Sequence, residues 1–181
     1  MAEAPAARPP EFAATAWLQP LPQAARLIFC GDDTAERALV AALALPGPAA
    51  TCTASSNAAR SMLWLGPDER LLLAPADQRL TLIAAIAATL AGQAHSLVDI
   101  SHRQVAFALH GSEAVRLLNA QCPLELTLAA FPVGMCTRTI YAKSEIVLWR
   151  TATDRFHIEV WRSFAPYMVT LLQDVARESG G

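Results

Sequence analysis

Two stretches of the chain repeat one succession of apolar and polar positions. Each begins with a short apolar run, a glycine turn and a segment whose apolar residues have helical spacing. Two apolar runs around a polar turn and a second helical segment follow. In the first stretch we expect these elements at residues 26–30, 34–45, 61–65, 70–73 and 77–91. In the second we expect them at residues 104–109, 113–119, 145–149, 155–160 and 165–178.

The turn between strand and first helix has the same form in both stretches. Gly31-Asp32-Asp33 precedes one helix, and Gly111-Ser112 precedes its counterpart. Asp and Ser cap helices because their side-chain oxygens accept hydrogen bonds from N–H groups of the first turn. The acidic residues beside each turn oppose phosphate at the positive end of the helix dipole, so neither turn predicts a nucleotide site.

Each stretch therefore predicts a β-α-β-β-α unit with mainly antiparallel strands and helices on one face. The expected fold class is α+β. Its two pseudo-repeated halves, at about residues 22–93 and 94–178, form one domain at residues 22–181. The segment 80–90 is apolar almost all round, which indicates a helix buried on more than one side. It is expected to fill the seam between the halves or to contact another subunit.

Residues 1–21 form a Pro/Ala-rich N-terminal arm outside this pattern. Such a segment favours extended backbone and cannot build a core of its own. Trp17 and Leu18 are its large anchors. The arm is either a disordered tail or a segment laid over a partner and held by Trp17.

The composition suits a partner-binding domain better than a nucleic-acid-binding one. The chain has 181 residues, of which 54% are hydrophobic and 17% charged, and its net charge is −2. A chain with so few charged residues favours a permanent protein partner, because obligate interfaces resemble a domain core cut in half. No cluster of Lys and Arg is present to neutralise phosphates, which argues against nucleic acid and an anionic membrane.

The cysteines and the N-terminus predict a cytoplasmic protein. Cys30, Cys52, Cys122 and Cys136 form no C-x-x-C pair and no zinc-ligand spacing with His, so buried reduced thiols are expected. The N-terminus lacks a basic start followed by an apolar run, and the most apolar stretch is too short to span a bilayer.

The sequence predicts no catalytic, cofactor-binding or metal-binding residue in this chain. Asp99, Ser101 and His102 are the most reactive-looking group, but on an extended segment His102 points away from the other two. A turn or strand-edge network is the expected role. The four histidines are scattered, without the i, i+4 pairing of metal ligands.

Aromatic and basic residues of the second stretch are the candidate partner contacts, because Trp and Arg dominate interface energies. Solvated charges on a strand face and a core position for Trp149 are the alternatives. With the tryptophan of the arm, the candidate contacts are Trp17, Arg138, Lys143, Trp149, Trp161 and Arg162.

Several sequence blocks resemble the gamma-subunit family of the bacterial heterotetrameric sarcosine oxidases. The resemblance covers about residues 22–175 and leaves out the arm. Its first-half blocks are Leu-Trp-Leu-Gly-Pro-Asp-Glu and Leu-Leu-Leu-Ala-Pro. In the second half they include Val-Asp-Ile-Ser-His-Arg, Gly-Ser-Glu-Ala, Cys-Pro-Leu-Glu-Leu, Phe-Pro-Val-Gly-Met-Cys-Thr-Arg-Thr, Glu-Ile-Val-Leu-Trp-Arg and Arg-Ser-Phe-Ala.

The resemblance implies a non-catalytic small subunit of a complex that oxidises sarcosine to glycine with formation of peroxide. It implies alpha, beta and delta subunits as partners and transfer of the one-carbon unit to tetrahydrofolate. FAD, FMN, NAD, tetrahydrofolate and zinc are then expected on the other subunits. The implied fold is similar to the folate-binding domain of the glycine-cleavage aminomethyltransferases (T-proteins).

One block departs from the aminomethyltransferase pattern. Those enzymes carry Gly-Gly-x-x-Asp-Asp in a hairpin, and its aspartate is catalytic. The matching stretch here begins Lys143-Ser144-Glu145, so Glu145 is the only substitute carboxylate. An assembly subunit is favoured on this ground. An independent folate-binding protein and a scaffold outside sarcosine metabolism remain alternatives.

Overall fold

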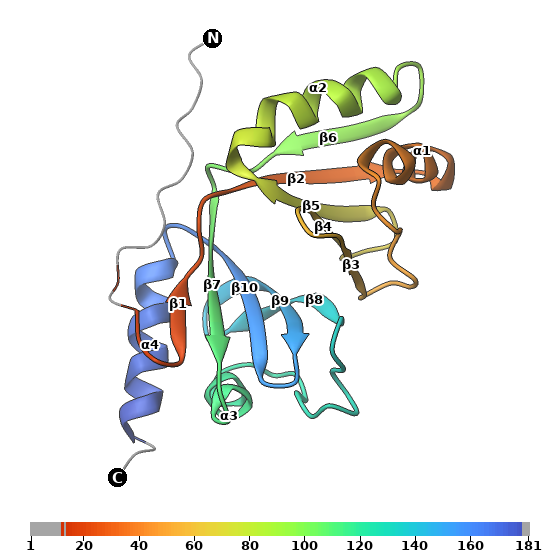
Figure 1. The fold of residues 1–181 in the computed structure, drawn as a ribbon. Coiled ribbons are helices and arrows are strands. Elements are labelled where there is room, and N and C mark those ends of the chain that lie inside the picture. Colours follow the sequence, from red (N-terminus) through yellow and green to blue (C-terminus); the bar gives the residue numbers. More distant parts are fainter. Residues whose placement is uncertain (1–11, 13, 179–181) are drawn as a thin grey trace. The chain divides into compact units, whose positions relative to one another are not determined.

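The computed structural model describes residues 12 and 14–178, which fold into two compact units. Unit 1 holds residues 23–102. The described part of unit 2 holds residue 12, residues 14–22 and residues 103–178. Each unit has one five-stranded antiparallel sheet, and its helices pack on one face of that sheet (Figure 1). The expected α+β class and the antiparallel pairing are thus confirmed.

Unit 1 is built around the long strand β2. Its sheet has the strand order β3-β4-β5-β2-β6, and Leu27, Phe29 and Leu72 point from it into a core with helices α1 and α2. In chain order the elements are β2 (Ala24–Gly31), α1 (Asp33–Leu43), β3 (Ala54–Ser56), β4 (Ser61–Trp64), β5 (Glu69–Pro75), a 3-10 turn (Ala76–Gln78), α2 (Arg79–Thr89) and β6 (His95–Asp99).

Unit 2 repeats this plan around β7. Its strand order is β1-β7-β10-β9-β8, and α3 and α4 cover the face that carries Phe107, Leu148 and Ile158. The elements are β1 (Leu18–Pro20), β7 (Gln104–His110), α3 (Ala114–Asn119), β8 (Cys136–Tyr141), β9 (Ser144–Ala152), β10 (Arg155–Trp161) and α4 (Ala165–Glu178).

The edge strand beside the central strand completes the repeat. β1 pairs antiparallel with β7 in unit 2, and β6 pairs antiparallel with β2 in unit 1. Each of these edge strands immediately precedes the central strand of the other unit in the chain. The two halves of the chain therefore exchange edge strands. The boundary between the units falls after His102, later in the chain than the expected position near residue 93.

The end of the expected arm belongs to unit 2. Leu18 is fully buried in its core, and the main-chain oxygen of Trp17 accepts a hydrogen bond from His110 N at 2.8 Å. The Pro-rich composition of this segment argued against a strand. Pro20 is nevertheless tolerated, because β1 is an edge strand of three residues. The part of the predicted arm before Phe12, and Ala13, lie outside the described residues.

Within this chain, helix α2 is buried on one side only, and its expected contact with another subunit stays a prediction. It buries Leu82 and Ile86, whereas Leu80 on the opposite face is 58% exposed. Most of the remaining positions are alanines, and alanine adds little apolar area, so the buried stripe is narrow.

The two glycine turns start their helices differently. Asp32 caps α1 as predicted, and its carboxylate accepts hydrogen bonds from Thr34 N and Ala35 N. The prediction of Ser112 as a cap is wrong. Glu113 occupies the cap position of α3 without a side-chain bond, because Ala114 N already donates to Gly111 O at 3.0 Å in a tight turn. Gly111 adopts φ +104°, which favours glycine.

Candidate partner-binding surface

Asp99 and Ser101 form a structural network in unit 1 that leaves out His102, so the three residues do not converge as a catalytic triad does. The hydroxyl of Ser101 accepts a hydrogen bond from Arg26 N at 2.9 Å. The carboxylate of Asp99 accepts from Ser101 N at 2.9 Å and from Arg79 Nη1 at 2.6 Å. His102 is exposed. The group ties the end of β6 to β2, as the expected strand-edge role requires.

The pKa of Asp99 lies below its usual value. Burial alone would raise it, but the hydrogen bonds from Ser101 and the nearby Arg79 guanidinium stabilise the charged form and outweigh that effect. A carboxylate held charged in this way stabilises the fold and is a poor proton acceptor at neutral pH.

Glu145, the substitute for the aminomethyltransferase aspartate, is held in a surface ion pair. Its Oε1 lies 3.3 Å from Nη1 of Arg138, and more than half of its side chain is exposed. Among the described residues, no three of His, Cys, Asp and Glu come together to hold a metal ion.

One end of the unit 2 sheet gathers three of the six candidate contacts. Strand pairing sets Ile146 opposite Val160, so Lys143 before β9 and Arg162 after β10 lie at the same end. Trp161 pairs with Gln104, and Arg162 N donates to Arg103 O at 2.9 Å. We call this end the aromatic–cation surface; it comprises Arg103, Lys143, Trp161, Arg162, Phe164 and Tyr167.

Aromatic rings on this surface face solvent. Trp161, Phe164 and Tyr167 are 39%, 42% and 41% exposed. Phe164 N donates to Trp161 O at 2.8 Å in the turn that leads into α4, and Tyr167 follows three residues later on the same helical face. The guanidinium of Arg103 lies 4.8 Å from the centre of the Trp161 ring, in cation–π contact.

The other candidate contacts have partners inside unit 2. Arg138 pairs with Glu145. Trp149 lies 5.7 Å, centroid to centroid, from His157, whose Nε2 is 2.8 Å from Oε1 of the buried Glu159. These residues lie on the sheet face opposite the helices. Trp149 is half-buried on that face and packs against its neighbours in the sheet, so it is not a fully exposed contact residue.

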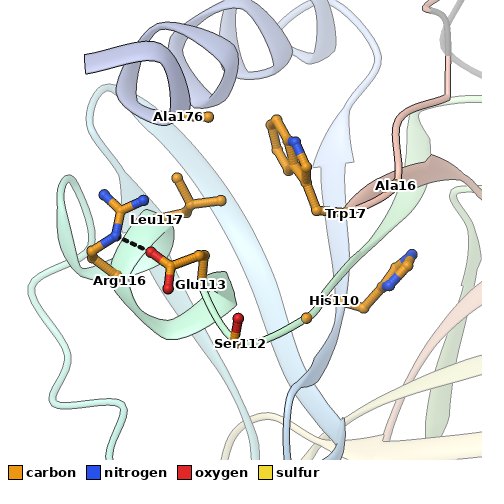
Figure 2. A pocket seen from close by; sticks show the side chains of 9 residues that line it. Ala16, Trp17, His110, Ser112, Glu113, Arg116, Leu117 and Ala176 are labelled. Atoms are coloured by element: carbon orange, nitrogen blue, oxygen red, sulfur yellow. Dashed lines mark hydrogen bonds and ion pairs between the residues drawn. The ribbon is translucent and has the colours of Figure 1, made fainter. Parts of the chain in front are cut away.

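Trp17 lines a pocket of about 470 Å³ in unit 2. Figure 2 shows its indole on one side of the pocket. Leu117 and Arg116 of α3 lie on the other side, together with Glu113 at the cap of α3, which is ion-paired with Arg116. Ala176 of α4 completes the rim. Trp17 thus packs partly against the core of its own unit and also borders an open hollow.

Three residues of the aromatic–cation surface were missed by sequence reasoning: Arg103, Phe164 and Tyr167. Arg103 ends one sequence block of the predicted resemblance, and Phe164 lies in another. Neither block indicates that the side chain of Arg103 or Phe164 is exposed. The spacing of Phe164 and Tyr167 at the start of a helix was the available signal.

Comparison with known proteins identifies one family. The model of the sarcosine oxidase, gamma subunit family matches residues 30–178. A sarcosine oxidase subunit gamma of Corynebacterium sp. (strain P-1) is 33% identical over 125 residues, which are 69% of this chain and 61% of that protein. The chain therefore spans about three fifths of that curated relative.

Solved structures agree on the fold. A chain of the heterotetrameric sarcosine oxidase from Corynebacterium sp. U-96, in complex with pyrrole 2-carboxylate, matches with a TM-score of 0.83 and 28% identity. The match covers 91% of this chain and 85% of that one. The glycine cleavage system aminomethyltransferase T from Bartonella henselae matches with a TM-score of 0.63 and 15% identity, over 86% of this chain and 44% of that chain, which confirms the expected fold similarity. None of the described helices is long and apolar enough to cross a bilayer.

Proposed function

The chain belongs to the sarcosine oxidase gamma subunit family, and from this premise we propose that it is a non-catalytic assembly subunit of a heterotetrameric sarcosine oxidase. In this proposal the complex demethylates sarcosine oxidatively to glycine, forms peroxide and passes the one-carbon unit to tetrahydrofolate. Alpha, beta and delta subunits are the proposed partners. They carry the proposed FAD, FMN, NAD, tetrahydrofolate and zinc.

The exposed face of α2 is the observation that carries the proposal. No charged residue occurs from residue 80 to residue 94, yet Leu80, Ala84, Ala87 and Ala88 of this segment face solvent. A helix on the surface of a monomer normally carries charges on its outer face. An uncharged outer face supports a permanent contact with another subunit, because such interfaces are as apolar as a domain core.

The predicted contact residues divide into two groups in this proposal. Lys143, Trp161 and Arg162 are proposed as direct partner contacts, since they are exposed at one end of unit 2. Trp17, Arg138 and Trp149 are proposed as contacts of a second kind, which present one side to a partner while the other side packs within unit 2. We also place the complex in the cytoplasm, a proposal that the four free thiols support.

Co-expression of the tagged chain with its three candidate partner subunits tests the proposal. The chain should recover a yellow complex with sarcosine-dependent peroxide formation, and omission of the chain should abolish that recovery. Ala88→Glu on α2 should weaken assembly at least about tenfold, because the interface would bury an unpaired carboxylate.

Ala42→Glu on α1 is the matched control. Ala42 and Ala88 are both exposed, and each is the penultimate residue of an 11-residue helix, so the new charge meets a similar helix dipole. Ala42→Glu should assemble normally. A chain recovered alone, with full activity in the remaining subunits, would refute the proposed function.

A further inference from the structure

Three cations of the aromatic–cation surface lack a neutralising carboxylate among the described residues. Within residues 12 and 14–178, neither Arg103 nor Lys143 nor Arg162 forms an ion pair. The nearest carboxylates along the chain already have partners: Asp99 pairs with Arg79, Glu145 with Arg138 and Glu159 with His157. The surface therefore carries uncompensated positive charge on a chain whose net charge is −2.

Arg103 is held in place by two contacts within unit 2. Its guanidinium stacks on Trp161 at 4.8 Å, and its main-chain oxygen is fixed by Arg162 N. Its Nε is buried and has no acceptor among the described residues. A planar guanidinium held by stacking loses little further freedom when it binds a carboxylate through two parallel hydrogen bonds.

The aromatic rings of the same surface indicate that the ligand also has apolar side chains. Trp161, Phe164 and Tyr167 offer exposed apolar area at this end of unit 2, and the indole N–H of Trp161 and the hydroxyl of Tyr167 add polar tips, as interface hot spots do. A free small anion would leave these rings exposed, whereas a peptide segment would cover them. The ligand that fits is thus a protein segment with carboxylates beside apolar side chains.

We infer that the aromatic–cation surface binds an acidic segment of another subunit of the complex. Carboxylates of that segment pair with Arg103, Lys143 and Arg162, and its apolar side chains cover the three rings. The inference rests on the proposed function and goes beyond it by assigning the chemistry of the partner and the end of unit 2 that it meets.

Charge reversal in the co-expressed complex tests the inference. The double variant Lys143→Glu/Arg162→Glu should be retained by the partner subunits about tenfold less well than the unmodified chain. Arg155→Glu is the matched control, because Arg155 is exposed at the opposite end of the same strand, β10. Trp161→Ala should also weaken retention. Thermal melting of each full chain alone identifies any variant that fails to fold.

Carbodiimide coupling provides a second test that needs no destabilising change. Lys143 is the only lysine of the chain, and a carbodiimide joins an amine directly to a carboxylate that it contacts. The assembled complex should give a cross-link from Lys143 to an Asp or Glu of a partner, and Lys143→Arg should abolish it.

The outcomes separate this inference from the proposed function. If the charge-reversed chain is retained as well as the Arg155→Glu chain, or if Lys143 cross-links to no partner carboxylate, the inference is overturned while the assembly role stands. If the unmodified chain does not join the partner subunits, both are overturned. Loss of retention in the double variant together with the Lys143 cross-link supports the inference.

Discussion

The guanidinium of Arg150 donates to the main-chain oxygen of Phe131 at 2.7 Å, across 19 positions of the chain. The same side chain donates to Leu126 O at 3.0 Å and to Thr153 O, and it lies 4.8 Å from the ring centre of Phe156. Arg150 is 2% exposed, and burial lowers its pKa. This buried cation fastens the long connection between α3 and β8 to the inner strand β9.

Replacement of Arg150 by lysine should destabilise the protein by about 3 kcal/mol. Lysine keeps the charge, but its single ammonium cannot reach three carbonyl groups on different sides, so buried acceptors lose their donors. Urea denaturation followed by tryptophan fluorescence measures the loss. Arg155→Lys, at an exposed position of the neighbouring strand, should change stability by less than about 0.5 kcal/mol. Equal stabilities for the two variants would contradict this role for Arg150.

Sequence reasoning found the elements whose apolar periodicity is strong and missed the strands β1, β3, β6 and β8. The hairpin strands β4, β5, β9 and β10 and all four α-helices lie close to their predicted ranges. β1 and β3 have three residues each, too few for a periodic signal. β1 in addition depends on the distant strand β7, with Leu18 opposite Leu109. The sequence around a short strand does not indicate which distant strand it pairs with.

The position of Lys143 and Arg162 at one end of unit 2 was predictable for a related reason. In a predicted hairpin, the residues just before the first strand and just after the second strand lie at the same end of the strand pair. Lys143 and Arg162 could therefore be assigned to one end of the predicted hairpin. The burial of Arg150 could not be foreseen, because an arginine in an amphipathic strand is normally solvated. Its three carbonyl acceptors come from loops whose course the sequence does not specify.

Gly31 should not tolerate a methyl group. A Cβ atom at this position would lie 2.6 Å from Cζ of Phe29, which is fully buried in the unit 1 core. Gly31→Ala must therefore displace the ring, at a cost of about 1–3 kcal/mol in the free energy of unfolding. Gly47→Ala is the control, since its Cβ would meet Val40 at an ordinary 3.6 Å. The prediction is wrong if the melting temperatures of the two variants coincide.

Asp99 should make stability depend on acid pH. Its folded pKa is lowered, so it contributes stability above its unfolded pKa near 3.8 and loses that contribution as pH falls through the folded value. Asp99→Asn should cost about 1 kcal/mol at pH 7, and the difference from the unmodified chain should shrink below pH 4. Denaturant titrations at several pH values measure it. Asp174→Asn, in an exposed pair with Arg177, should show a much smaller difference, and a gap for Asp99→Asn that stays constant to acid pH would refute the account.

Tyr141 should make stability depend on alkaline pH in the opposite sense. Its hydroxyl donates to Leu117 O at 3.1 Å in the unit 2 core, and burial, with smaller effects of Cys122 and Tyr167, raises its pKa from 10.0 to about 12. The unfolded chain then loses the phenolic proton at a lower pH than the folded chain does. The contribution is present below pH 10 and is lost as pH rises towards 12, up to about 3 kcal/mol in all.

Tyr141→Phe tests this directly, because phenylalanine keeps the ring and removes the titrating group. The variant should lose about 1 kcal/mol at pH 8, where the hydrogen bond to Leu117 is absent, yet its unfolding free energy should fall less steeply above pH 10. Since the two proteins differ only at residue 141, subtraction of the two pH profiles isolates Tyr141. Parallel profiles from pH 9 to pH 11.5 would show that the buried phenol does not govern the alkaline loss of stability.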